Sequence, residues 1–479
     1  MTTALAVDAP PIILVPRRQR TKSAVHRMAL AAVWLTVALS FLVFSEPAPF
    51  DALTLGLMVL LPVIGLFDAK RGLTAAFSLW LLVAACLAIS CFLARDTAEA
   101  TQHSAVTFYL FGACFLFAGF IAKNPNAHTR LVLNAYFTAT IIAAALGVIG
   151  YLDLFPGAFD LLTRYGRATG TFKDPNVFGP FLIPGLLMAL HLWLIRPVWR
   201  GILPLAAAAL ITLAILFSFS RGAWAATVLA LALYGYVYLH SAERNIDRLK
   251  LAGLVLIGTA IFGLLLAVAL QSDSVAQLLQ ERAALTQPYD EGPEGRFGGQ
   301  EKAFGLILEN PLGIGGQAFT HFHHHEEAHN VYLSMFMNAG WLGGFIYLLV
   351  CLGTLGLGFR HALKATQTQL LFVIAYAALA GNIIEGFLID TDHWRHFFVL
   401  MGIVWGLMAS DTRVKRKARI VRDVRPVLMR AILFVPPSKR GVRIVGRVPS
   451  RLPLQLGRVS HPRRRPETRR QSRIVGSGY

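Results

Sequence analysis

The chain has 479 residues, of which 55% are hydrophobic and 15% are charged. Soluble chains usually carry about 25% charged residues, so this composition excludes an ordinary soluble enzyme. The mean hydropathy is +0.56 over the whole length, and one anchor cannot account for it because a single membrane span needs only about 20 apolar residues. We therefore expect a chain that crosses a membrane many times.

The net charge of +19 is concentrated at the C-terminus. The 69 residues from Asp411 to Tyr479 hold 20 Lys and Arg and 3 acidic residues, or +17, whereas the other 410 hold 25 and 23, or +2. We interpret 411–479 as a disordered cytoplasmic tail that binds anionic membrane lipids, at about 1 kcal/mol per basic residue near the surface. No nucleic-acid partner is expected.

Apolar segments predict about twelve transmembrane helices. A basic N-terminus at 1–27 precedes them, residues 28–270 hold the first nine, and residues 331–410 hold the last three, with one large loop at 271–330 between the two groups. All four cysteines fall inside these segments, which favours packing roles over disulfides or a metal site. The segments lie near 28–44, 52–67, 73–94, 105–122, 131–150, 177–195, 202–218, 223–240, 251–270, 331–357, 369–389 and 397–409, and the cysteines are Cys86, Cys91, Cys114 and Cys351.

The distribution of basic residues in the short loops predicts the orientation. Lys and Arg concentrate on the cytoplasmic side, and with the N-terminus inside, every inside loop carries at least two of them, beginning with Lys70 and Arg71. An even number of helices returns the tail to the same side. Both termini are therefore predicted to be cytoplasmic, and basic residues on the outer side need a reason.

Arg167 is one of these outer residues. It lies in the stretch Arg164-Tyr-Gly-Arg167-Ala-Thr-Gly-Thr-Phe-Lys173-Asp174-Pro175 before the sixth span. Asp174 followed by Pro175 is a helix start signal. The stretch is either a capped loop with topological charges or an anion site in which Arg167 approaches a phosphate among glycines and hydroxyls.

Arg221 stands between two apolar runs with almost no loop. The 39 residues from 202 to 240 would extend about 58 Å as helix, which is two crossings of an apolar core about 30 Å thick. The turn must therefore lie at the membrane surface. An arginine there either reaches headgroup phosphates or has a partner or a function.

A histidine-rich stretch, His321 to Asn330, ends the large loop. The residues His325-Glu-Glu-Ala-His329 match H-E-x-x-H, in which two histidines on a helix bind zinc, but no third ligand is evident. Alternatively, Asn330 caps a helix that begins at Val331, and His329 stands at its N-terminus. That position helps to keep an imidazole neutral, as a general base requires.

Together these motifs resemble the O-antigen ligase and O-antigen polymerase superfamily of bacterial inner-membrane glycan transferases. The resemblance covers about 160–355 and implies an all-α polytopic membrane protein with GT-C-like helical architecture and one large, catalytic periplasmic loop. The residues that carry it are Arg167 with Gly170, Asp174-Pro175-Asn176, Ser220-Arg221-Gly222, Arg296, Pro311-Leu-Gly-Ile-Gly315, His329-Asn330 with Tyr332, and Gly340 with Gly343.

The resemblance also implies an activity. A glycan passes from undecaprenyl pyrophosphate to an acceptor hydroxyl on the periplasmic face of the inner membrane, without metal, nucleotide or other cofactor. By motif, Arg167 and Arg221 hold the pyrophosphate with Arg296 as a further binding residue, and Arg221 and His329 are catalytic. The additional histidines leave open which histidine acts.

Two functions of the same superfamily remain, and one of another class. An O-antigen ligase in lipopolysaccharide synthesis uses lipid A-core as acceptor, whereas a polymerase uses a growing glycan. A lipid-linked glycan transporter would instead need charged or broken helices near the bilayer midplane. Glycosyl transfer fits the arginines, because negative charge develops on the leaving pyrophosphate.

Overall fold

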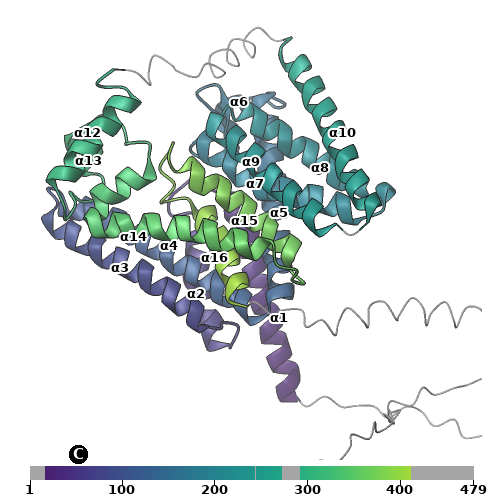
Figure 1. The fold of residues 1–479 in the computed structure, drawn as a ribbon, viewed down its shortest axis with the longest axis horizontal. Coiled ribbons are helices and arrows are strands. Elements are labelled where there is room, and N and C mark those ends of the chain that lie inside the picture. Colours follow the sequence, from purple (N-terminus) through teal and green to yellow (C-terminus); the bar gives the residue numbers. More distant parts are fainter. Residues whose placement is uncertain (1–16, 243, 272–291, 411–479) are drawn as a thin grey trace, which may run out of the picture. The chain divides into compact units, whose positions relative to one another are not determined.

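The computed structural model describes residues 17–242, 244–271 and 292–410, all within one compact unit (Figure 1). Fifteen α-helices and one two-stranded hairpin form this part of the chain. The tail at 411–479, residues 1–16 and residues 272–291 of the predicted loop lie outside the described residues.

Each of the twelve predicted apolar segments corresponds to a helix. Eight helices of the described ranges are long and apolar enough to cross a membrane, and α2, α15 and α16 are apolar but shorter. The prediction of an all-α polytopic membrane protein is confirmed. The helices are α1 (Arg17–Ala38, continued by the 3-10 turn η1, Leu39–Phe41), α2 (Pro49–Val63), α3 (Arg71–Leu93), α4 (Thr97–Lys123), α5 (Pro125–Tyr151), α7 (Pro175–Ile195), α8 (Val198–Phe217), α9 (Arg221–Ser241), α10 (Asn245–Ala269), α14 (Val331–Ala362), α15 (Gln369–Glu385) and α16 (Arg395–Ala409).

Five short elements lie between these helices. They are α6 (Ala158–Leu162), the strands β1 (Thr163–Arg164) and β2 (Arg167–Ala168), α12 (Arg296–Glu309) and α13 (Ala318–Phe322). The described end of the predicted 271–330 loop is therefore about half helical, with 14 residues in α12 and 5 in α13. It packs on α14 through a small apolar core of its own, formed by Ala303, Ile307, Phe319, Ala328 and Met337.

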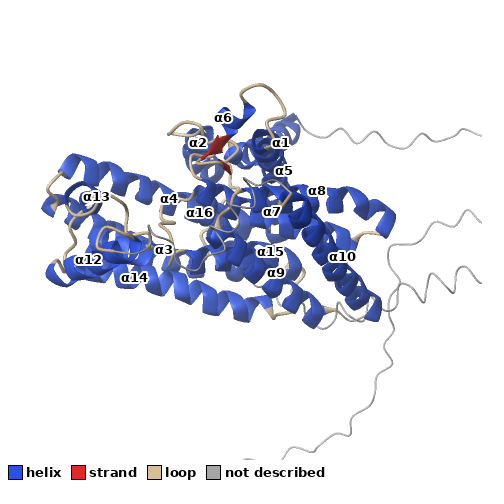
Figure 2. Ribbon diagram, turned by 90° about the horizontal axis from the view of Figure 1, so that it is seen from above, coloured by secondary structure: helices blue, strands red, loops and turns tan. Residues whose placement is uncertain are grey.

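The most deeply buried helices are α7, α15 and α16, which are apolar on nearly every side. The helix α16 packs on α4, α15 packs on α9, and α7 packs on α8 and α9, while α14 lies along α3 (Figures 1 and 2). Helices that are apolar all round are expected inside a bundle. Longer helices surround these three, so α15 and α16 do not have to span a bilayer themselves.

Because α15 is short, the connection from 386 to 394 begins within the depth of the membrane and not at its surface. Its 17 residues extend about 26 Å, less than the apolar core of about 30 Å. His393 of this connection contacts Thr107, which is about 15 Å along α4 from its start at Thr97. Irregular backbone at membrane depth is tolerated where protein surrounds it.

The helix α14 changes direction at Gly340, where φ is +67° and ψ is −175°. The Pro311–Gly315 segment fills the bend, because the Trp341 amide donates to the Pro311 carbonyl (2.9 Å) and the Ile314 amide donates to the Met337 carbonyl (2.7 Å). A Cβ at 340 would lie 2.6 Å from the Pro311 carbonyl oxygen. Gly340 is therefore required twice, for its backbone conformation and for space.

We expect Gly340→Ala to destabilise the protein by about 1–3 kcal/mol, because the new Cβ meets strained backbone and a clash together. Thermal denaturation in detergent, followed by circular dichroism, measures the effect. Gly353→Ala is the matched control, since this glycine of the same helix has open space where its Cβ would lie. Equal denaturation midpoints for the two variants would contradict the interpretation.

Candidate functional site

A tight hairpin positions Arg167 at one end of the bundle. Thr163 pairs with Ala168 and Arg164 with Arg167 in antiparallel register, and Figure 2 shows the two strands beside α6. The turn residues Tyr165 and Gly166 both have positive φ, 55° and 67°, as a type I′ turn requires. The side chain of Arg167 then points inward, and only 6% of the residue is exposed.

Arg167 fastens two helix ends together. Its Nε donates to the Ser218 carbonyl and one Nη donates to Asn176 Oδ1, each at 2.7 Å. Asn176 belongs to the first turn of α7, which Asp174 caps and Pro175 begins as predicted. Ser218 belongs to the turn between α8 and α9. The guanidinium of Arg167 therefore holds the turn that carries Arg221.

Arg221 is the first residue of α9 and is half-buried. Ser220 caps the helix by accepting from the Ala223 amide, and Phe219 before it has φ of +47°. At Gly222 a Cβ would lie 2.3 Å from Glu385 Oε1, so this glycine makes room for a buried carboxylate. The Ser-Arg-Gly motif thus encodes a cap, a cation at a helix N-terminus and an open approach for Glu385.

His329 and Arg296 meet at the start of α14. Asn330 caps this helix by accepting from the amides of Tyr332 and Leu333, which confirms that the helix begins at Val331. His329 has φ of +48° and its side chain is 34% exposed. Arg296 donates through Nη2 to the carbonyls of His329 and Leu388.

The helical H-E-x-x-H motif, one of the two interpretations of His325 to His329, does not form in the structure. Residues 323–330 form no helix, so the two histidines are not held one helical turn apart on one face. His329 Nε2 lies 3.5 Å from Glu326 Oε2, and His325 Nδ1 lies 3.4 Å from Glu294 Oε2. His325 Nε2 also lies 3.8 Å from Glu326 Oε1, so both imidazoles lie near this glutamate without sharing a helix face.

The α15–α16 connection, residues 386–394, links every part of this end of the protein. Next to it, Glu385 lies against α9, and the Gly386 carbonyl accepts from the Val331 amide (2.9 Å). Farther along, Asp390 accepts from Ser334 of α14 at 2.5 Å. The backbone thus runs from the Arg221 turn past the His329 segment to α4.

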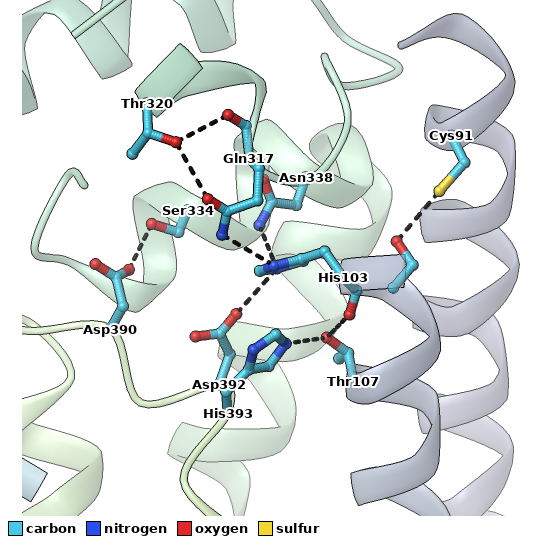
Figure 3. Close-up of polar contacts among 11 residues, drawn as sticks. Cys91, His103, Thr107, Gln317, Thr320, Ser334, Asn338, Asp390, Asp392 and His393 are labelled. Atoms are coloured by element: carbon cyan, nitrogen blue, oxygen red, sulfur yellow. Dashed lines mark hydrogen bonds and ion pairs between the residues drawn. The ribbon is translucent and has the colours of Figure 1, made fainter. Parts of the chain in front are cut away.

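A polar cluster surrounds the end of this connection (Figure 3). His103 Nε2 lies 3.5 Å from Asp392 Oδ2, and the His103 and His393 rings are 4.3 Å apart between centroids. The Asn338 amide also lies 3.4 Å from His103 Nε2, and the Gln317 amide lies 3.2 Å from His103 Nδ1 on the other side of the ring. Sequence reasoning missed this cluster, since its members come from α4, α13, α14 and the connection.

The charges of the cluster oppose those of the arginines. Burial raises the pKa of Asp390, and the neighbouring Asp392 raises it further. Burial alone would also raise the pKa of Asp392, but His393 and His103 lower it below its usual value. Burial lowers the pKa of His393, which favours a neutral imidazole.

Among the described residues, two groups of side chains could hold a metal ion. One is His103 with Asp392 and His393, and the other is Glu294 with His324 and His325.

The four predicted site residues thus form two pairs. Arg167 holds the turn of Arg221, Arg296 contacts His329, and the connection joins the pairs. Strained backbone marks the same places, because four of the five non-glycine residues with positive φ in the described ranges lie beside these groups: Tyr165, Phe219, Gln317 and His329. Such strain is frequent at functional sites.

Comparison with known families identifies the same segment. Residues 206–348 match the family model described as O-antigen ligase. The match includes Arg221, Arg296 and His329 and ends before the α15–α16 connection. No curated protein and no solved structure matches the chain. Residues 206–348 therefore form a segment that is similar to the O-antigen ligase family.

Proposed function

We propose that the protein is an O-antigen ligase-like glycosyltransferase that moves a glycan from undecaprenyl pyrophosphate to a hydroxyl of lipid A-core. The observation that carries the proposal is Arg221 at the N-terminus of α9, on a turn that a second buried arginine, Arg167, holds in place. A guanidinium on a preformed turn suits a diphosphate, whose oxygens accept several charge-assisted hydrogen bonds.

The backbone around Arg221 adds to this positive potential. The first turns of α7 and α9 come together through Arg167, and the first turn of α14 is tied to the end of α15 beside them. Helix N-termini carry a partial positive charge and exposed amides. The pyrophosphate would therefore lie against Arg221 and these helix ends, and Arg167 would act mainly by positioning them.

The proposed reaction forms one bond and breaks one. The acceptor oxygen bonds to the anomeric carbon of the glycan while the bond from that carbon to the phosphate oxygen breaks. Undecaprenyl pyrophosphate leaves with the electron pair, and Arg221 stabilises its developing charge. His329 takes the proton of the acceptor hydroxyl, with Arg296 holding the His329 backbone through its carbonyl.

The proposed orientation places this site at the periplasmic face of the bacterial inner membrane, with both termini in the cytoplasm. The distribution of basic residues supports this orientation, because the helix ends that lie away from the site carry Lys70, Lys123, Arg196 and Arg244. The predicted lipid-binding tail belongs to this proposal and falls in 411–479.

We expect Arg221→Ala to lower the transfer rate by about 10² to 10³, the usual cost of removing one preplaced donor from a developing anion. Purified protein with undecaprenyl-pyrophosphate glycan and lipid A-core measures the rate. Arg200→Ala is the control, because Arg200 lies at the opposite end of α8, stacked on Trp199. Full activity of Arg221→Ala would contradict the proposed role of Arg221.

His329→Ala should lose about 10² to 10⁴ in rate if His329 is the general base. His323→Ala changes the same histidine-rich stretch at an imidazole that has no hydrogen-bond partner among the described residues. It should keep its rate within about twofold of the parent's, a span below the 10² of any general-base loss. The same assay compares both variants. Equal losses in the two variants would assign the effect to the loop as a whole and remove His329 from the mechanism.

Deletion of the gene separates ligase from polymerase, the alternative in the same superfamily. A ligase deletion leaves lipid-linked polymer and bare lipid A-core, whereas a polymerase deletion leaves single repeats on the core. Electrophoresis of extracted lipopolysaccharide distinguishes the two. Full-length polymer on the core after deletion would exclude both functions.

A further inference from the structure

We propose that His103, Asp392 and His393 bind a divalent transition-metal ion, with Zn²⁺ the best match, and that this ion fastens the α15–α16 connection to α4. One ligand atom from each residue lies within 4.8 Å of the other two, and His103 Nε2 lies 3.5 Å from Asp392 Oδ2. Ligands at 2.0–2.2 Å in a tetrahedral zinc site are about 3.4 Å apart. Small side-chain rotations would complete the geometry.

The hydrogen bonds of His393 leave one ring nitrogen available. Thr107 donates its hydroxyl proton to the His103 carbonyl (3.2 Å), and the same oxygen lies 3.0 Å from His393 Nε2. Because that proton is already used, the oxygen accepts from Nε2–H. Nδ1 then carries the lone pair. A ligating histidine characteristically uses its second nitrogen in this way.

His103 has a comparable second contact. Its Nδ1 lies 3.2 Å from the Gln317 amide, while its Nε2 lies 3.5 Å from Asp392 Oδ2 and 3.4 Å from Asn338 Nδ2, a contact that an ion would replace. The oxygen and nitrogen of an amide can exchange places without a change in shape. With the Gln317 oxygen turned to Nδ1–H, Nε2 offers its lone pair to the ion, and Thr320 beside Gln317 accepts from the amide nitrogen.

The acidic side chains that line the adjoining cavity favour a cation. Its volume is about 40 Å³, and Glu327, Asp390 and Asp392 line it together with His103. None of the described lining residues is Lys or Arg. Asp390 Oδ2 is buried and has no hydrogen-bond partner among the described residues. The space exceeds the 10–15 Å³ that one water needs, so a water can complete a site of three protein ligands.

Sequence spacing could not have suggested this set, because 289 residues separate Asp392 from His103. The ion departs from the metal-free reaction implied by the resemblance, but it takes no part in the transfer step proposed above. Its effect is mechanical: it would fix the connection whose Leu388 carbonyl accepts from Arg296.

The test measures metal in the full-length protein, purified in detergent with a tag that contains no histidine. After incubation with ZnCl₂ and gel filtration, mass spectrometry should find about one zinc per chain in the parent and a small fraction of that in His103→Ala and His393→Ala. Co²⁺ in place of Zn²⁺ should give the visible absorption of a tetrahedral site in the parent alone.

The double variant His324→Ala/His325→Ala is the matched control, because it removes the other group of possible ligands. It should keep the zinc. A chelator should lower the denaturation midpoint of the parent and of this control, but not that of His393→Ala. His103→Gln provides a second, polar variant in case the alanine variant does not fold. A parent without bound zinc, or zinc lost only from the double variant, overturns the proposal.

Discussion

The backbone of the α15–α16 connection imposes the main constraint on this end of the protein. It leaves the helical hydrogen-bond pattern among apolar helices, where an unsatisfied amide or carbonyl costs several kcal/mol. Arg296 and the Val331 amide donate to two of its carbonyls. Arg395 then closes it with a bidentate ion pair to Asp51 of α2, at 2.8 Å for both contacts.

This requirement explains why segments far apart in sequence meet here. The start of α14, the start of α12 and the N-terminal half of α4 each supply a polar group to the connection. A buried ion pair adds little net stability but is costly to break. The Arg395–Asp51 pair is therefore better understood as fixing where α16 begins than as a source of stability.

The sequence was sufficient for features that depend on local chemistry. Hydropathy located all twelve apolar helices. Asp174 and Asn330 marked helix starts because capping involves neighbours within three residues. It was not sufficient for the end of α15, where apolar residues continue past Glu385 to Ile389 although the helix stops. At that boundary the Gly386 carbonyl accepts from the Val331 amide of α14, a tertiary contact that composition does not reveal.

The site shows the same limit. Arg221 and His329 stand out locally, one as a charge without a loop and one before a cap. Arg167 also stands out, but only tertiary structure reveals that its guanidinium binds the Ser218 carbonyl. His103 and Asp392 give no local signal of comparable strength, although an Asp-x-Asp-His sequence directly after an apolar span is unusual enough to suggest a function.

The electrostatics of the two halves give the proposed reaction a direction. Arg221 and the helix N-termini favour an anion, whereas Asp392, whose pKa His393 and His103 lower, disfavours one. In the proposed reaction, the diphosphate donor would therefore bind beside α9. The acceptor, which brings a neutral hydroxyl, can approach from the carboxylate side without that penalty. His329 lies between the two halves, since its carbonyl accepts from Arg296 and its imidazole lies 3.5 Å from Glu326, the neighbour of Glu327 in the chain. In the proposed reaction, this position along the backbone would let His329 take a proton at the point where donor and acceptor meet.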